Sequence, residues 1–343
     1  SQDSIYNYMA KAVLPFSATI EIIDRCNLNC VHCYRGEPQK TYWNIQTWSR
    51  VLDELKSLGT LHLTITGGEP FAHPDIIEML EIANEKGFVI SIQTNATYEL
   101  DRAIPVLKNS TIEAVFVSLY SMSARVHDFI TNQPGSLAKT KKNIETLMSC
   151  GVPVTVNCPG MVHNRDDMVQ VKSFCDNLGI KCNFAFKIIP SQQEDKQTLS
   201  LNCFSSSFLN ECIHDPNIRL YENELKSIRK AVANDRYCQT GFRSITFDAQ
   251  GNVLLCNAFR KNCGNVQKQS VSDIWKLSKE LNEWRDIKSR VNSKCQQCKA
   301  YPYCEPCPAH SYTLTGSDKD IDELSCSFGK ALYDADNQHS TQG

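Results

Sequence analysis

Several features that would define other protein classes are missing from this sequence. It has no run of about eighteen apolar residues, the length that a transmembrane helix requires. Its first residues, SQDSIYNYMAKAVLPF, lack the basic and apolar regions of a signal peptide. Charge of one sign is also missing, because 36 Lys and Arg against 38 Asp and Glu leave a net charge of −2. We therefore expect no nucleic acid and no membrane as partner, and a cytoplasmic location.

Cysteine, by contrast, is abundant, with 17 in 343 residues. Short secreted chains that are rich in cysteine are usually held by disulfides. This chain is long, shows no export signal and groups its cysteines at short spacings. That pattern favours the ligation of a metal or an iron–sulfur cluster in a reducing compartment. Disulfide bonding is the alternative.

Residues 17–190 alternate between short apolar strands and amphipathic helices. The expected strands cover 18–23, 61–66, 88–93, 113–119, 152–157 and 182–188. The expected helices cover 46–58, 75–86, 100–108, 137–149 and 166–177. Such repeated steps predict a parallel sheet with right-handed crossovers, and six steps are too few for a closed eight-stranded barrel. We predict an α/β fold with an open, partial (β/α)6 barrel, whose functional residues follow the strands.

The pattern changes after the last of these strands. Beyond residue 236 the strands are short, the cysteines are dense and the main expected helix covers 271–287. This change predicts a second, small cysteine-rich domain. The predicted division is 1–16 as an N-terminal extension, 17–190 as the barrel, 191–235 as a bridging segment with a helix over 221–233, 236–330 as the cysteine-rich domain and 331–343 as a C-terminal tail.

Three cysteines, Cys26, Cys30 and Cys33, stand directly after the first strand. A 4Fe–4S cube has four irons, so three thiolates leave one iron without a protein ligand, and a substrate or cofactor can bind there. A zinc site is the alternative, but zinc sites favour C-x2-C pairs and this spacing fits them poorly.

Polar or glycine-rich motifs follow the next strands. Gly67-Gly68-Glu69-Pro70 follows the second strand, where two glycines allow the backbone to approach a ligand closely and Glu69 can hold an ammonium group. Asn95 follows the third strand and Ser118 the fourth. Each motif alone is typical of an ordinary strand end, and their order gives them weight.

A second group of seven cysteines lies in the C-terminal third of the chain. They are Cys238, Cys256, Cys295, Cys298, Cys304, Cys307 and Cys326. Their two C-x2-C pairs could bind one zinc ion in a zinc ribbon. Seven thiols also suit two further iron–sulfur clusters.

Together these motifs resemble the signature of the radical S-adenosylmethionine (SAM) superfamily, with His32 in the aromatic position before the third cysteine and the likeness extending over residues 17–190. The resemblance implies that the open iron binds the amino and carboxylate groups of SAM. One electron then cleaves SAM to a 5′-deoxyadenosyl radical, which abstracts a hydrogen atom from the substrate. It implies Cys26, Cys30 and Cys33 as catalytic cluster ligands. The implied SAM-binding residues are His32, Tyr34, Gly67, Gly68, Glu69, Asn95, Ser118 and Ile189.

The C-terminal array resembles the SPASM extension, so the resemblance implies three 4Fe–4S clusters in all. Cys238, Cys256 and Cys307 would belong to auxiliary cluster I. Auxiliary cluster II would be held by Cys295, Cys298, Cys304 and Cys326. The chain departs from the family in having two residues rather than three before Cys307, which makes the ligation by Cys307 the least secure.

Two further cysteines have alternative interpretations. Cys263 is either the fourth ligand of auxiliary cluster I or a buried free thiol, and an open iron is the third option. Cys158 follows the fifth strand and could return a hydrogen atom to a substrate radical. A small thiol in the core is the more common situation.

The resemblance implies that the substrate is a ribosomally made peptide, which would be crosslinked, oxidised or epimerised. The alternatives are oxidation or epimerisation of an aminoglycoside, cyclitol or other small molecule, and a non-catalytic iron–sulfur or zinc protein. An external electron donor such as flavodoxin or ferredoxin is expected. About 16 residues precede the first strand, so we expect no fused leader-recognition domain, and a separate recognition protein is one option.

Overall fold

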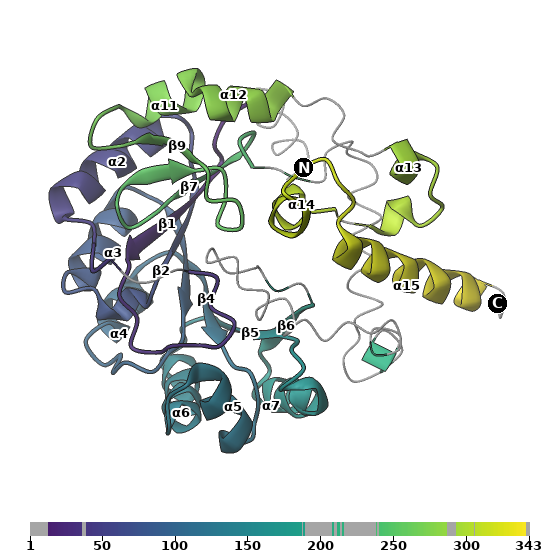
Figure 1. Cartoon of the computed structure of the whole chain (residues 1–343). Helices are drawn as coiled ribbons and strands as arrows, with labels where there is room; N and C mark the ends of the chain where they lie inside the picture. Colours follow the sequence, from purple (N-terminus) through teal and green to yellow (C-terminus); the bar gives the residue numbers. More distant parts are fainter. Residues whose placement is uncertain are drawn as a thin grey trace.

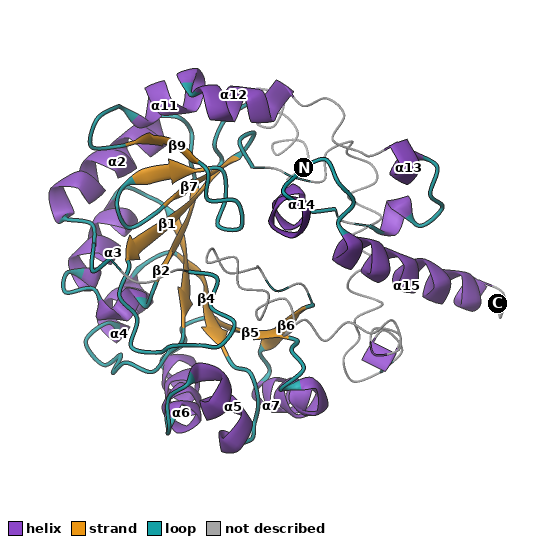
Figure 2. Ribbon diagram, in the orientation of Figure 1, coloured by secondary structure: helices purple, strands orange, loops and turns teal. Residues whose placement is uncertain are grey.

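The computed structural model describes residues 13–35, 39–186, 188, 208, 211–212, 215, 238, 240–286, 293–304 and 306–340. Six parallel strands lie side by side in chain order, as predicted. They are β1 (Ser17–Ile23), β2 (His62–Gly67), β3 (Val89–Thr94), β4 (Ile112–Ser118), β5 (Val154–Pro159) and β6 (Lys181–Ala185). The sheet is curved and does not close (Figure 2). The predicted α/β fold with a partial barrel is confirmed.

Helices connect these strands and cover the outer, convex face of the sheet (Figure 1). They are α2 (Ile45–Ser57), α3 (Ile76–Glu85), α4 (Ile104–Asn109), α5 (Ala124–Thr131), α6 (Ser136–Ser149) and α7 (Met168–Leu178), with 3-10 turns at Pro70–Ala72 and Arg165–Asp167. The sequence did not predict α5, because this two-turn helix is too short for a clear hydrophobic period.

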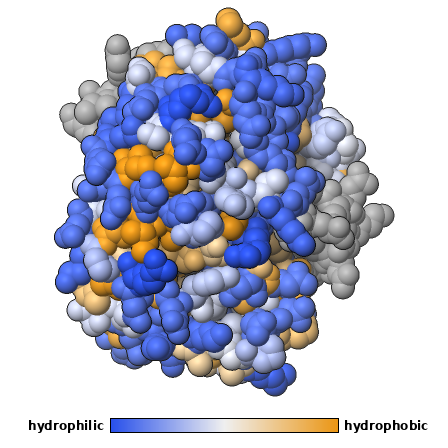
Figure 3. All heavy atoms as spheres, turned by 90° about the vertical axis from the view of Figure 1, so that its left-hand side faces the viewer, coloured by the Kyte–Doolittle hydropathy of each residue, from blue (hydrophilic) through white to orange (hydrophobic). Residues whose placement is uncertain are grey.

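Helix α2 shows how the sequence specifies this layer. The Asn44 side chain caps its first turn by accepting a hydrogen bond of 2.8 Å from the Thr47 amide. One face is buried against the sheet through Trp48, Leu52 and other apolar residues, and each such side chain contributes about 1.5–3 kcal/mol of hydrophobic stabilisation. The outward surface of this layer is mostly hydrophilic, with small apolar patches (Figure 3).

The cysteine-rich region continues the same sheet. Strand β7 (Ser244–Phe247) pairs in parallel with β1, and β8 (Asn252–Leu254) and β9 (Asn262–Asn265) add antiparallel strands beyond it. The sheet order is therefore β6-β5-β4-β3-β2-β1-β7-β8-β9. No local sequence pattern indicates this pairing, because β7 lies more than 200 residues after β1 in the chain. The pairing of β1 with β7 joins the barrel and the cysteine-rich region in one sheet.

The helices that follow correct two predictions. The helix expected over 271–287 is two helices, α11 (Val271–Leu277) and α12 (Lys279–Asp286), because Ser278 adopts an extended ψ of 125°. The tail expected from 331 belongs to α15 (Glu323–Ser340), which buries Ala331, Leu332 and Ala335. The shorter α13 (Ser293–Gln296), a 3-10 turn at Tyr301–Tyr303 and α14 (Pro308–Thr315) precede α15.

Two sequence predictions concern other parts of the chain. The helix expected over 221–233 lies outside the described residues. Among the helices of the described ranges, none is long and apolar enough to cross a bilayer.

Candidate metal centre and active site

The loop that carries Cys26, Cys30 and Cys33 begins where β1 ends. It closes on itself through a 3.0 Å hydrogen bond from the Cys33 amide to the Cys30 carbonyl. It also rests on the end of α5, because the Val31 amide donates to the Ile130 carbonyl at 2.9 Å. Helix α5, which the sequence analysis missed, therefore helps to shape the loop.

The three thiols lie close enough for each to affect the pKa of its neighbours. Burial, followed by the charge of Glu69 and then of Cys33, raises the pKa of Cys26 to about 11. Burial, followed by the charge of the other two thiols, raises the pKa of Cys30 to about 12. The amide of Leu28 and the side chain of Asn95 approach the Cys26 sulfur at 3.4 and 3.6 Å. A bound metal would stabilise all three as thiolates. The chemistry of this donor set fits an iron–sulfur cluster with three protein ligands.

Gly67 and Gly68 pack against this loop. A Cβ atom on Gly67 would lie 2.4 Å from the Ile23 carbonyl oxygen, and one on Gly68 would lie 2.2 Å from that of Arg25. The Gly68 amide donates to the Ile23 carbonyl at 2.7 Å. The glycines therefore allow a close approach of backbone to backbone, which differs from the predicted approach to a ligand and fixes the motif against the cysteine loop.

Glu69 is fully buried beside the same loop. Its carboxylate accepts hydrogen bonds from the Thr94 hydroxyl at 2.7 Å, the Asn95 amide at 2.8 Å and the Phe71 amide at 3.1 Å. Burial raises the pKa of Glu69 to about 7, and these three donors oppose the shift. Glu69 therefore joins the ends of β2 and β3, and Asn95 links this pair to Cys26. The structure brings Glu69 and Asn95 together.

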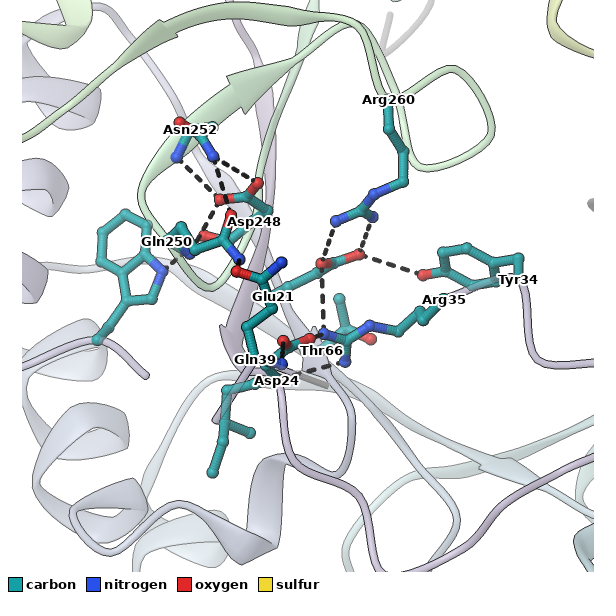
Figure 4. Close-up of polar contacts among 12 residues, drawn as sticks. Glu21, Asp24, Tyr34, Arg35, Gln39, Thr66, Asp248, Gln250, Asn252 and Arg260 are labelled. Carbon is teal, nitrogen blue, oxygen red and sulfur yellow. Dashed lines mark hydrogen bonds and ion pairs between the residues drawn. The ribbon is translucent and has the colours of Figure 1, made fainter. Parts of the chain in front are cut away.

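The other predicted SAM contacts lie on different sides of the loop. The His32 ring meets the Tyr120 ring edge-on at 4.9 Å, and burial lowers the His32 pKa to about 4, so the ring is neutral. No donor or acceptor among the described residues reaches its buried Nδ1. Ser118 ends β4 and is half-buried. The Tyr34 hydroxyl points toward β1 and donates to Glu21 at 3.3 Å (Figure 4). Ile189 lies outside the described residues.

The sequence analysis assigned no role to Tyr120, which the structure places against the cysteine loop. Its buried ring contacts His32 and His127, and burial, followed by the charge of Cys30, raises its pKa well above the usual value. The only signal in the sequence was its position two residues after Ser118.

The C-terminal thiols of the described residues lie in two groups of neighbours. Burial, followed by the neighbouring Cys238 and Cys307, raises the pKa of Cys256 to about 11. Cys295 likewise has its pKa raised by burial and then by Cys326 and Cys298. Cys307 therefore lies near Cys238 and Cys256.

The second group surrounds a cavity. Cys295, Cys298, Cys304 and Cys326 all line it, together with Asp320 and Asp322. In the described part of the chain, no three Cys, His, Asp or Glu side chains gather tightly enough for a single metal ion. The walls are closely packed, because a Cβ atom on Gly329 of α15 would lie 2.9 Å from the Cys304 Cβ. Four thiols around one cavity fit a 4Fe–4S cluster.

Asp322 joins the two groups, and the sequence analysis did not identify it. This buried carboxylate accepts hydrogen bonds from the Cys307 amide at 3.0 Å and from the Ser325 amide at 3.1 Å. His310 lies 3.7 Å away. The bond to Ser325 caps the first turn of α15, which carries Cys326. The Asp322 side chain therefore fixes the backbone at Cys307 in one group and the helical turn that carries Cys326 in the other.

The structure bears on the alternative interpretations of Cys263 and Cys158. Cys263 is 5% exposed on β9, and its thiol donates to the Lys261 carbonyl at 3.5 Å. Its charged neighbours are Glu280, Lys261 and Arg285 rather than other thiols, which favours a buried free thiol. Cys158 is 1% exposed and belongs to the main hydrophobic core, which favours a core thiol over a hydrogen-atom donor.

Comparison with known families agrees with this site. Residues 20–175 match the model of the radical SAM superfamily, and residues 238–299 match SPASM, an iron–sulfur cluster-binding domain. The chain belongs to the radical SAM superfamily and carries a SPASM domain. These two domains imply SAM and 4Fe–4S clusters as cofactors.

The relatives differ in what they make. The chain is 23% identical over 86% of its length to the AdoMet-dependent heme synthase of Methanosarcina barkeri, and covers 92% of that protein. It is 27% identical to the antilisterial bacteriocin subtilosin biosynthesis protein AlbA of Bacillus subtilis, with 86% and 67% of the two chains covered. The structure of Streptococcus suis SuiB bound to precursor peptide SuiA has a TM-score of 0.73 at 18% identity, with 95% and 80% covered.

Proposed function

We propose that this chain is an enzyme that cleaves SAM reductively and uses the resulting radical to modify a ribosomally made peptide. The observation that carries the proposal is the convergence of Cys26, Cys30 and Cys33 at the carboxyl edge of the sheet, next to Glu69 and Asn95. A 4Fe–4S cluster held there would supply one electron to SAM and leave one iron free for it.

The surrounding residues suit the binding of SAM. Glu69 has three donors on its carboxylate, and ionised carboxylates can accept about four hydrogen bonds, so one position remains for the SAM ammonium group. His32 is neutral and has a free Nδ1 within the described residues, so it can contact the adenine without adding charge. Ser118 and Asn95 offer polar groups for the ribose and carboxylate.

The C-terminal thiols support two auxiliary clusters, for a total of three. Cys238, Cys256 and Cys307 would hold the first, with one iron open or bound by another residue. Cys295, Cys298, Cys304 and Cys326 would hold the second. These groups would carry an electron between the substrate and an external donor such as a flavodoxin or ferredoxin.

A peptide substrate is supported by the names of several relatives. AlbA and the sporulation killing factor maturation protein SkfB of Bacillus subtilis, as well as PqqA peptide cyclases, are among them. We infer that this chain likewise acts on a precursor peptide, with a separate leader-recognition protein as a further partner.

A second candidate is a small molecule, and the heme synthases favour a tetrapyrrole over the aminoglycosides and cyclitols. Three heme synthases, each 22–23% identical to this chain, have matches covering 86–90% of it. In that case the enzyme would abstract hydrogen from a tetrapyrrole side chain, and no precursor peptide would be modified.

The test uses the anaerobically reconstituted enzyme with SAM and dithionite. The proposal predicts about twelve irons per chain, as three four-iron clusters require. It also predicts 5′-deoxyadenosine, together with a mass change on a short peptide encoded beside the gene. A mass change on a tetrapyrrole, with the peptide unmodified, would establish the second candidate. Zinc in place of iron, with no SAM cleavage, would identify a non-catalytic protein and refute both.

A further inference from the structure

A charged residue lies in the middle of β1. Glu21 has an exposed fraction of 0%, and the strand around it is otherwise mainly apolar. A buried carboxylate costs several kcal/mol unless it is paired and hydrogen-bonded. Arg260 provides this pairing, because its Nη1 and Nη2 donate to the two Glu21 oxygens at 2.7 and 2.9 Å (Figure 4). Such two-point pairs fix the orientation of both side chains.

On its other side, Glu21 contacts the loop that carries Cys26, Cys30 and Cys33. The Tyr34 hydroxyl donates to it at 3.3 Å, and the Arg35 guanidinium lies 3.8 Å from it. These two residues directly follow Cys33. Arg35 is itself held by an ion pair with Asp24 and by a 3.3 Å bond to the Ile23 carbonyl. The end of the cysteine loop is therefore fixed relative to Glu21.

Arg260 belongs to the loop that carries Cys256. Its neighbour Phe259 donates an amide hydrogen bond of 3.2 Å to the Cys256 sulfur, and the Cys256 amide donates back to the Phe259 carbonyl at 3.2 Å. The position of Arg260 is thus tied to that of the Cys256 thiol. One buried carboxylate therefore contacts both cysteine loops.

The charges in this cluster balance without a ligand. Glu21 and Asp24 carry two negative charges, and Arg35 and Arg260 carry two positive ones. The guanidinium of Arg260 is already engaged by both carboxylate oxygens. These ion pairs connect the two loops. They do not form a binding site for an anionic substrate.

We propose that Glu21 is a positioning residue that holds the Cys33 loop and the Cys256 loop in a fixed relation, so that SAM cleavage stays coupled to modification of the substrate. The inference rests on the proposed function. The pairing of β1 with β7 aligns only the strands, through Ser17–Ile20 and Ser244–Phe247. The loops beyond those strands need the Glu21 contacts to keep their separation, and a misplacement of about 1 Å can reduce a reaction strongly.

The test is Glu21→Gln in the reconstituted holoenzyme. This variant keeps the shape of the side chain and removes the charge that both arginines need. We expect iron content and SAM cleavage near those of the wild type, while the amount of product per 5′-deoxyadenosine falls about tenfold or more. Hydrogen exchange should become faster in both loops, 33–35 and 256–260, and remain unchanged in β3–β5.

Two further variants make the test specific. Arg260→Gln should also speed exchange at 33–35, although the substituted residue is more than 200 positions away in the chain. Asp248→Asn is the matched control, because Asp248 is a second buried carboxylate near Arg260 whose side chain accepts hydrogen bonds within its own turn, from Gln250 and Asn252. It should leave both the product ratio and exchange at 33–35 unchanged.

Several outcomes would overturn the inference. One is a wild-type amount of product per 5′-deoxyadenosine in Glu21→Gln. Another is hydrogen exchange that becomes faster in only one of the two loops. If Glu21→Gln does not fold, the same readings in Arg260→Gln decide the question. A wild-type enzyme that does not cleave SAM would refute the proposed function instead, and the exchange comparison would still decide the role of Glu21.

Discussion

The two cysteine regions differ in what holds them in place. The loop of Cys26, Cys30 and Cys33 follows β1, which lies between β2 and β7 near the middle of the nine-stranded sheet. Backbone hydrogen bonds to β2 and to the end of α5 hold this loop. The C-terminal thiols are spread between residues 238 and 326, in loops, in the short helix α13 and near the start of α15.

This difference indicates two ways of building a metal centre. In the first, the sheet arranges the ligands and the metal binds to a prepared loop. In the second, the metal is itself part of what holds the segments together, as in small metal-dependent domains. Asp322 is the main buried polar contact that joins the C-terminal groups without metal. The predictions below test this contrast, from the largest expected effect to the smallest.

Cys30→Ala should abolish 5′-deoxyadenosine formation, because two thiols cannot hold a cluster that leaves one iron free for SAM. The measurement is product analysis after dithionite reduction, with iron content determined on the same sample. Cys150→Ala is the matched control, since Cys150 ends α6 and is only half-buried. Retained SAM cleavage in reconstituted Cys30→Ala would refute the N-terminal assignment.

Cys304→Ala should leave part of the SAM cleavage and lose the modified product. Cys304 lines the C-terminal cavity, so its loss should remove the second auxiliary cluster while the barrel loop keeps its iron. Iron content should fall by about one third, the share of one cluster in three. Product at the wild-type level would show that this cluster is not needed.

Much of the barrel could be predicted because its signals are local. The strand and helix periods, Gly59 after α2 and Gly179 after α7 each report on neighbouring residues, and the observed elements agree with them to within a few positions. The cysteine groups were also readable, since their spacing reflects the ligation of one cluster by one segment.

The rest depends on contacts between distant parts of the chain. The pairing of β1 with β7 and the partner of Glu21 involve residues more than 200 positions apart, which no local pattern records. A charged residue inside an apolar strand was the one available signal for Glu21. The break at Ser278 was missed because α11 and α12 share a continuous apolar period, and the packing of α15 was missed because its C-terminal half is polar.

Removal of iron by a chelator should affect the C-terminal region first. Hydrogen-exchange protection should fall over 293–340, where the thiols join short segments, while β1–β5 keep their protection because backbone pairing holds them. The comparison is made on one reconstituted sample before and after chelation. Simultaneous loss of protection in β2–β4 would contradict the contrast between the two regions.

The smallest effect is expected at the cap of α2, on the sheet side of the comparison. Asn44→Ala removes the hydrogen bond to the Thr47 amide and should lower the free energy of unfolding by about 1 kcal/mol. Ser57→Ala, at the other end of the same helix, is the matched control, because its hydroxyl bonds only to the Asp53 carbonyl within the helix. Since α2 packs against α3 and α11 in the described part of the chain, iron content and SAM cleavage should match the wild type in both variants. Loss of iron from Asn44→Ala would mean that the barrel loop depends on the stability of the whole sheet layer, and that the sheet does not present its cysteines as an independently prepared site.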